Sequence, residues 1–207
     1  MNIGILGTGN VGGTLGERFA KLGHHVFYGS REPEKLSELV KRSGATARAV
    51  SIAEAVQSAE VVVVALPWTA VKSVLQSVNL TGKIVFDCVN PLLPDLSGVE
   101  VGTTTSAGEQ VAQWARGAKV VKIFNTTGSN NMANPNYGVT GASMFYCGDD
   151  KPAKEVARKL AAELGFDPVD SGPLSNARFL EPLAALWIWL AYPGGHGRDI
   201  VFQLVSR

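Results

Sequence analysis

The chain of 207 residues is poor in cysteine and histidine and carries almost no net charge, with two Cys, three His and a balance of +1. Cys88 and Cys147 each lie in an apolar run, which favours buried, reduced thiols over a disulfide. The histidines lack the spacing of metal ligands, so we expect no metal site. A nearly neutral chain also lacks the basic surface that nucleic acids or anionic membranes attract, and we expect neither as a partner.

Long apolar runs are missing too. The longest, LAALWIWLAY over 183–192, has ten residues, whereas a membrane-spanning helix needs about twenty. The first apolar segment begins at residue 2 or 3 and leaves no room for a signal peptide. We therefore expect a cytoplasmic protein that does not insert into a membrane.

Short apolar segments alternate with amphipathic ones along the chain. We expect strands over 2–7, 25–29, 46–50, 60–67, 83–91, 119–125, 142–148 and 166–170. Helical patterns follow most of them, and 125–138 is too rich in Asn and Gly to be regular. This alternation predicts an α/β fold of the Rossmann type, with a doubly wound, mostly parallel sheet of about eight strands and a C-terminal helical segment. We expect residues 1–207 to form a single domain.

A glycine-rich turn, GTGNVGG over 7–13, joins the first strand to the first helix. Gly7 permits the tight turn, Gly9 lets the backbone approach a pyrophosphate, and Gly12 lets the helix pack closely on the strand. The N-terminus of the helix offers free amides to the phosphates. The predicted dinucleotide contacts are Gly7, Thr8, Gly9, Asn10, Val11 and Gly12.

The second strand ends without the acidic residue that usually binds the ribose hydroxyls of NAD. Gly29, Ser30 and Arg31 stand there instead, and Lys35 follows in the next helix. A ribose 2′-phosphate would be repelled by a carboxylate, but it can accept hydrogen bonds from Arg31 and Ser30 and is attracted by Lys35. The sequence therefore predicts NADP(H) as the cofactor.

Three further strand ends are expected to face the same crevice, because ligands of open α/β sheets bind beyond the carboxyl ends of the strands. The residues at these ends are Leu66, Pro67, Trp68, Asn90, Pro91, Asn125, Thr126 and Thr127. Asn125 and the two threonines can position a carboxamide or a substrate ring. We expect no His or Lys directly at a strand end, and we expect Asp87 to be a buried, hydrogen-bonded carboxylate. A crevice without an acid or base favours hydride transfer between two rings by positioning alone.

Several stretches resemble the NADP oxidoreductases that use the 8-hydroxy-5-deazaflavin coenzyme F420. They are GTGNVGG, YGSR, ALPW, CGDD at 147–150 and DSGPLSNARFLEPLAAL at 170–186, and together they span nearly the whole chain. The cytoplasmic reductase domains of six-transmembrane ferric reductases are similar too, notably around VVKIFNT. The resemblance implies an NADPH-dependent reductase of a deazaflavin or flavin, with a C-terminal segment that lines the acceptor pocket.

One loop departs from the family pattern, since this chain has Asn125-Thr126-Thr127-Gly128 where deazaflavin enzymes tend to carry His-Thr-Ile-Pro. Deazaflavin, FMN, FAD and small electrophiles therefore all stand as candidate small-molecule hydride acceptors. A non-catalytic NADP(H)-binding redox sensor is the alternative hypothesis, because a sensor also needs no acid or base. A reductase of small imines or carbonyls is a third, which the short chain disfavours.

The last predicted helix is apolar on every side. Trp187 and Trp189 are two residues apart and point about 200° apart around a helix. Such a helix has to be buried, either in the core of the monomer or beneath a second subunit. We expect residues 173–207 to form the interface of a homodimer.

Overall fold

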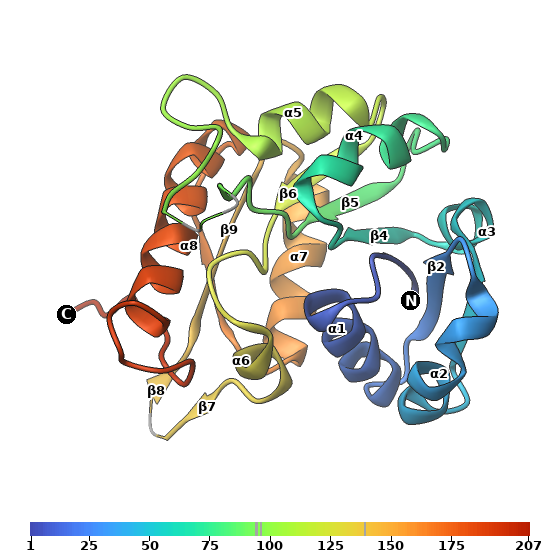
Figure 1. Ribbon diagram of the computed structural model, residues 1–207, viewed down its shortest axis with the longest axis horizontal. Helices are drawn as coiled ribbons and strands as arrows, with labels where there is room; N and C mark the ends of the chain where they lie inside the picture. Colours follow the sequence, from blue (N-terminus) through green and yellow to red (C-terminus); the bar gives the residue numbers. More distant parts are fainter. Residues whose placement is uncertain (94, 96, 139) are drawn as a thin grey trace.

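The computed structural model describes residues 1–93, 95, 97–138 and 140–207, and an eight-stranded sheet with helices on both faces dominates it (Figure 1). The strands are β1 (Asn2–Leu6), β2 (His25–Ser30), β3 (Ala47–Ser51), β4 (Val61–Val64), β5 (Ile84–Asp87), β6 (Lys119–Lys122), β9 (Ser143–Gly148) and β10 (Asp167–Asp170). Their order is β10-β9-β6-β5-β4-β1-β2-β3. The predicted Rossmann-type sheet is confirmed.

Strands β9 and β10 are the exceptions to the parallel arrangement, because β9 runs antiparallel to β6 and β10 runs parallel to β9. Between these strands the chain passes through a short helix, α6 (Ser129–Ala133), and a small hairpin of β7 (Asn136–Tyr137) and β8 (Thr140–Gly141). The expectation of an irregular stretch over 125–138 is thus wrong. The buried Asn131 accepts a hydrogen bond from the Tyr137 hydroxyl and donates to the Arg198 and Ile200 carbonyls of the C-terminal segment. Contacts to a distant segment of this kind override local propensity.

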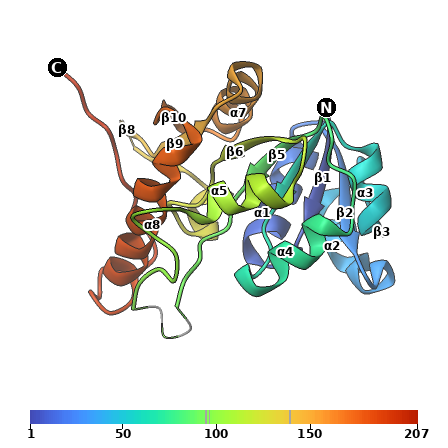
Figure 2. The same ribbon diagram turned by 90° about the horizontal axis from the view of Figure 1, so that it is seen from above.

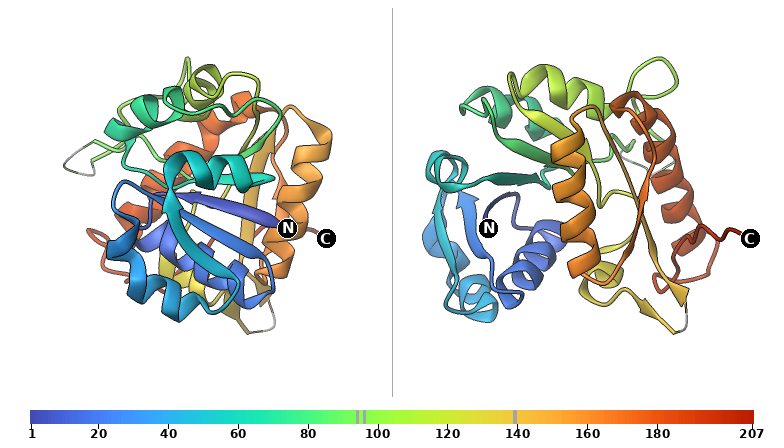
Figure 3. Two further views of the ribbon diagram at one scale, coloured as in Figure 1. Left: turned by 90° about the vertical axis from the view of Figure 1, so that its right-hand side faces the viewer. Right: turned by 180° about the vertical axis from the view of Figure 1, so that it is seen from behind.

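Helices cover the sheet on both sides (Figure 3). Their bounds are α1 (Asn10–Lys21), α2 (Ser37–Ser43), α3 (Ile52–Ser58), α4 (Trp68–Gln76), α5 (Ala107–Trp114), α7 (Lys151–Glu163) and α8 (Ala177–Ala191), with single 3₁₀ turns at Pro33–Leu36 and Leu174–Asn176. Apolar side chains of α1, α2 and α7 fill one core, and those of α3, α4 and α5 fill the other. Strand β4, with four consecutive buried valines, separates the two, as expected for a strand covered on both faces.

Helix α8 stands beside β9, at the end of the molecule far from β3 (Figure 2). Trp187 is 4% exposed and Trp189 is 54% exposed, so the two indoles do point in different directions. Phe179 and Leu186 are exposed as well. The helix therefore leaves an apolar stripe uncovered instead of being buried on every side. Among the described residues, no helix is long and apolar enough to cross a membrane.

Both cysteines are buried and unpaired. Burial raises the pKa of the Cys88 thiol far above its ordinary range and that of Cys147 to about 12. Because the thiolate is the reactive form, we expect the native protein to resist a chromogenic disulfide reagent at pH 8. Both thiols should react once the protein is unfolded in guanidinium. Rapid labelling of the native protein, with the melting temperature unchanged, would contradict this burial.

Candidate functional site

The glycine turn between β1 and α1 is held by close backbone packing. Gly7 has φ +97°, and a Cβ there would lie 2.3 Å from the Ala65 carbonyl oxygen. A Cβ on Gly12 would lie 1.8 Å from the carbonyl oxygen of Gly7. Both glycines are therefore required by the protein itself, as the predicted roles in the tight turn and the helix–strand contact demand.

Gly9 is different, because a Cβ there would meet nothing within 4 Å. Gly9 is the N-cap of helix α1, which has no capping side chain and no acidic residue in its first turn. An uncapped helix N-terminus beside an open glycine is an arrangement that accepts phosphate. The free space at Gly9 is thus available to a ligand.

The contrast between these glycines gives a paired prediction. We expect Gly9→Ala to fold with the wild-type melting temperature but to bind NADPH more weakly, because the added methyl group occupies the space of the ligand. Gly12→Ala should instead lower the melting temperature, because its methyl group collides with the backbone. Thermal melts and fluorescence titrations of both variants test the pair. Wild-type NADPH affinity in Gly9→Ala would show that the pyrophosphate does not lie at this turn.

A hollow of about 550 Å³ opens at the carboxyl ends of β1, β2 and β4. This hollow, called the glycine-loop hollow below, is lined by Gly7, Thr8, Gly29, Ser30, Arg31, Ile52, Leu66, Pro67, Ala70, Ser73, Val74 and Ser77. The Ser30 hydroxyl accepts a hydrogen bond from the Glu32 amide, so its proton remains available for a ligand. Arg31 is exposed and takes part in none of the ion pairs formed among the described residues. This hollow therefore presents an uncommitted guanidinium and a hydroxyl.

Lys35 lies apart from this pair. Its ammonium group is 2.5 Å from a carboxylate oxygen of Glu32, and both side chains are exposed. Lys35 lines a neighbouring hollow on the other side of the glycine turn, together with Gly9 and Asn10. Ser30 and Arg31 thus line the same hollow, whereas Lys35, which was predicted to join them, lines a different one.

A second cavity, of about 280 Å³, lies where β5 and β6 end and α8 passes. This strand-end cavity is lined by Asn10, Asn90, Asn125, Thr127, Gly128, Ser129, Ala184, Trp187, Ile188, Tyr192 and Arg198. The lining contains no carboxylate, imidazole or ammonium group among the described residues. Asn10 follows Gly9 in the glycine turn, whose Gly7 and Thr8 line the glycine-loop hollow, so the two hollows are neighbours at the same edge of the sheet without sharing a lining residue.

Two asparagines from neighbouring strand ends form a reciprocal pair at this cavity. Asn90 Nδ2 donates to the Asn125 carbonyl at 2.8 Å, and Asn125 Nδ2 donates to Asn90 Oδ1 at 3.0 Å. A second proton of Asn125 Nδ2 goes to the Leu180 carbonyl in α8 at 3.1 Å. Asn125 Oδ1 is buried without a partner among the described residues. It is therefore an acceptor that a ligand amide can satisfy.

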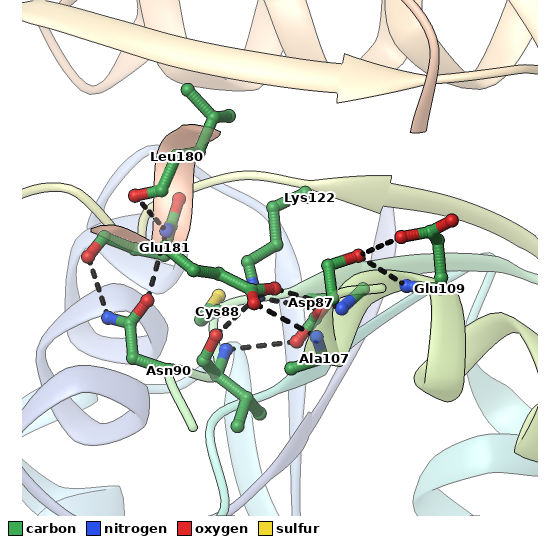
Figure 4. A network of polar contacts seen from close by, with 12 residues as sticks. Asp87, Cys88, Asn90, Ala107, Glu109, Lys122, Leu180 and Glu181 are labelled. Atoms are coloured by element: carbon green, nitrogen blue, oxygen red, sulfur yellow. Dashed lines mark hydrogen bonds and ion pairs between the residues drawn. The ribbon is translucent and has the colours of Figure 1, made fainter. Parts of the chain in front are cut away.

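The expectation that no Lys stands at a strand end is wrong, because Lys122 is the last residue of β6. It is fully buried, and its ammonium group lies 3.0 Å from Asp87 and 2.9 Å from Glu181 (Figure 4). Burial alone would lower the pKa of Lys122, but the two carboxylates outweigh it and hold that pKa above its ordinary value. Lys122 is thus a permanent donor and cannot act as a base near neutral pH. Asp87 is buried and hydrogen-bonded, as predicted.

The remaining predicted residues occupy packing positions. Val11 packs on the core beneath α1, and Trp68 stacks against Trp114 with ring centroids 5.2 Å apart. Pro91 is buried and its carbonyl accepts a hydrogen bond from Glu100. Thr126 is also buried. These residues shape the loops around the two hollows without lining either of them.

Sequence reasoning did not name the helix residues that line the two hollows, although the resemblance implied that the C-terminal segment lines the acceptor pocket. Ala70, Ser73 and Val74 of α4, with Ser77 at its C-terminal cap, line the first, and Ala184 and Ile188 of α8 line the second. Their spacing of three and four residues is the periodicity of one helix face, so the signal was present. Tyr192 and Arg198 follow α8, where no periodicity could have indicated them.

The fold, the uncapped glycine turn and the two adjoining hollows define this chain as a dinucleotide-binding protein of the Rossmann type. Residues 2–91 match the family model described as NADP oxidoreductase, coenzyme F420-dependent. The F420-dependent NADP reductase of Methanothermobacter marburgensis is 30% identical over 205 aligned positions, covering 91% of this chain and 91% of the relative. A putative F420-dependent NADP reductase structure from Arthrobacter sp. FB24 has a TM-score of 0.89 at 31% identity, with 100% of each chain covered.

This chain belongs to the coenzyme F420-dependent NADP oxidoreductase family, and it is an NADP(H)-dependent oxidoreductase. The resemblance seen in the sequence is thereby confirmed. Metalloreductase STEAP3 of Rattus norvegicus is also related, at 32% identity over 191 positions that cover 90% of this chain. The chain spans 37% of the length of that relative.

Proposed function

We propose that this oxidoreductase transfers hydride between NADPH and a flavin or deazaflavin ring that enters the strand-end cavity. The observation that carries the proposal is the adjacency of two hollows with complementary chemistry. The glycine-loop hollow offers Arg31 and Ser30. The strand-end cavity offers amide groups and aromatic side chains, and its described lining contains no carboxylate, imidazole or ammonium group. A nicotinamide ring supplies the hydride itself, so the protein has only to bind and orient the two rings.

Each part of the chain has a defined task in this proposal. The α1 amides and Gly9 bind the pyrophosphate, while Arg31 and Ser30 bind the ribose 2′-phosphate. The free Oδ1 of Asn125 accepts a hydrogen bond from the carboxamide and fixes the orientation of the nicotinamide ring. Trp187 and Ile188 exclude water on the side of α8, in the segment 173–207 that we assign to the acceptor. Holding two rings in contact is enough to account for a large part of the acceleration.

An acceptor panel tests this proposal. Purified protein is mixed with NADPH and with FMN, FAD, deazaflavin or a ferric chelate, and loss of reduced-nicotinamide absorbance is followed. We expect turnover with at least one tricyclic ring and much slower oxidation of NADH. Tight NADPH binding without turnover on any acceptor would contradict the proposal and favour the redox sensor. Turnover on the ferric chelate alone would place the chain functionally nearer the metalloreductases.

The proposal includes a homodimer formed through α8. Phe179, Leu186 and Trp189 recur along one side of the helix and are between 49% and 71% exposed. Contiguous exposed apolar side chains of this kind mark an interaction surface, and a second copy of the same helix offers a matching one. Location in the cytoplasm is also part of the proposal, supported by two buried, unpaired cysteines.

Trp189→Asp is the informative dimer variant. The exposed indole lies on the proposed interface, so the charge should convert a dimer to a folded monomer, as measured by light scattering after size exclusion. Trp187→Asp would test folding instead, because Trp187 is buried and donates to the Ile200 carbonyl. Leu22→Asp, at an exposed position beyond α1, is the matched control and should leave the mass unchanged. A wild type that is monomeric at micromolar concentration would refute the dimer.

A further inference from the structure

The buried ion network around Lys122 has no part in the chemistry described above. It nevertheless joins strands β5 and β6 to helix α8 and, through Glu181, to helix α5. Lys122 ends β6, Asp87 ends β5, and Glu181 lies in α8. All three side chains are 0% exposed. Lys122 also donates to the carbonyl of Val89, the residue before Asn90. Three charges in a dry interior are costly unless every one of them is paired and hydrogen-bonded.

Glu181 connects this network to the N-terminus of α5. Its two carboxylate oxygens accept hydrogen bonds from the amides of Ala107 and Gly108, each at 2.9 Å (Figure 4). The Glu181 carboxylate therefore lies at the positive N-terminal end of the α5 dipole. This dipole stabilises the second negative charge of the network, which the single charge of Lys122 does not balance. One turn earlier in α8, Arg178 forms a bidentate pair with Glu109. These two contacts fix both the position and the rotation of α8 against α5.

The ion network is linked to the strand-end cavity through two residues, Leu180 and Val89, each of which adjoins or contacts an asparagine of the cavity. The carbonyl of Leu180, next to Glu181, accepts a proton of Asn125 Nδ2. The amide of Val89 donates to Asp87 at 2.9 Å, which holds the segment leading to Asn90. Displacement of Glu181 therefore moves an acceptor of Asn125, and displacement of Asp87 or Lys122 moves its partner asparagine. Trp187 and Ile188 of the cavity wall belong to the same helix as Glu181.

We propose that Asp87, Lys122 and Glu181 are positioning residues for the nicotinamide half of the cofactor, holding the Asn90–Asn125 pair and the α8 wall in place. The inference rests on the proposed function of the two hollows. It assigns a different task to each end of the site. The glycine-loop hollow is built without these three residues, so binding of the adenosine half does not depend on them.

Two ligands separate this role from a general contribution to stability. Adenosine 2′,5′-bisphosphate occupies only the adenosine half, whereas NADP⁺ occupies both. In Glu181→Gln one oxygen becomes an NH₂ group facing a backbone amide or Lys122, so α8 has to shift. We expect the affinity for NADP⁺ to fall about three- to tenfold, the range for one misplaced hydrogen bond. The affinity for the bisphosphate should stay within about twofold of wild type.

Two controls complete the experiment. Leu160→Ala removes a fully buried side chain of α7 in the core beneath the sheet, and it should lower the melting temperature without changing the ratio of the two affinities. In the double variant Glu181→Gln with Asn125→Ala, the two losses of NADP⁺ affinity should fail to add, because Glu181 acts through Asn125. Glu181→Asp keeps the charge but shortens the reach, and it replaces Glu181→Gln if that variant does not fold.

Equal losses for both ligands, or no loss for either, would overturn the positioning role and leave the network a purely structural one. Full additivity with Asn125→Ala would overturn it as well. Failure of the proposed function looks different. Wild-type protein that binds neither NADP⁺ nor the bisphosphate would show that the two hollows do not hold the cofactor. Absence of turnover in the acceptor panel would leave the ratio of the two affinities unchanged.

Discussion

Arg31→Ala should weaken NADPH binding by about 1.5 to 3 kcal/mol, or about ten- to 150-fold, and leave NADH binding nearly unchanged. The guanidinium lines the glycine-loop hollow beside Ser30 and has no carboxylate partner among the described residues. It is therefore free to form a charge-assisted pair with a ribose 2′-phosphate, which NADH lacks. Fluorescence titration of the variant with both nucleotides measures the effect.

Lys35→Ala is the matched control. It removes the same charge from the same segment, but Lys35 is paired with Glu32 and lines a different hollow. We expect a loss of NADPH affinity of less than about 1 kcal/mol, as for other exposed charges. If Lys35→Ala were the larger effect, the 2′-phosphate would lie on the other side of the glycine turn.

Asn125→Ala should lower kcat/KM by about one to two decades without abolishing turnover. The change removes the free Oδ1 and both hydrogen bonds of Nδ2, so the nicotinamide loses its orientation but keeps its phosphate contacts. Steady-state NADPH oxidation with the best acceptor measures the loss, and a thermal melt confirms the fold. A folded variant that lost four decades would reveal an obligatory chemical role for Asn125.

The pH profile of kcat/KM should lack a steep limb from a protein group between about 6 and 9, because His and Cys are the side chains that ordinarily titrate there. Neither type lines the strand-end cavity in the described part of the chain. Lys122, whose pKa the two carboxylates raise, stays protonated throughout this range. The stabilising effect of its charge is present below the ordinary pKa of lysine and is lost only at strongly alkaline pH. A steep limb near neutrality in a single-turnover experiment would require a proton-transfer group in the protein.

The sheet and the glycine turn could be predicted because their signals are local. A continuous apolar run such as β4, or the spacing of Gly7, Gly9 and Gly12, depends only on neighbours in the sequence. The Ser-x-x-Glu spacing of a capping box, at Ser51 and Glu54, is local as well, and the Glu54 amide donates to the Ser51 hydroxyl. A predicted strand also predicts which residues stand at its carboxyl end. The sequence therefore indicated Asn90 and Asn125 as cavity residues as well.

The ion network and the antiparallel β9 could not be predicted, because each depends on contacts between distant segments. Lys122 sits in an ordinary-looking strand and finds Glu181 only after α8 has returned to the sheet. Before β9 the chain passes through α6, whose Asn131 donates hydrogen bonds to the Arg198 and Ile200 carbonyls of the C-terminal segment. No local pattern encodes such partners.

In the proposed function the two hollows form one site for NADPH, with the guanidinium of Arg31 on its 2′-phosphate. The decisive measurement is a pair of fluorescence titrations of the wild-type protein, one with NADPH and one with NADH. We expect NADPH to bind well over about tenfold more tightly, since at least one charge-assisted contact distinguishes the two nucleotides. Equal dissociation constants would contradict the account, because the glycine-loop hollow would then not recognise a phosphate.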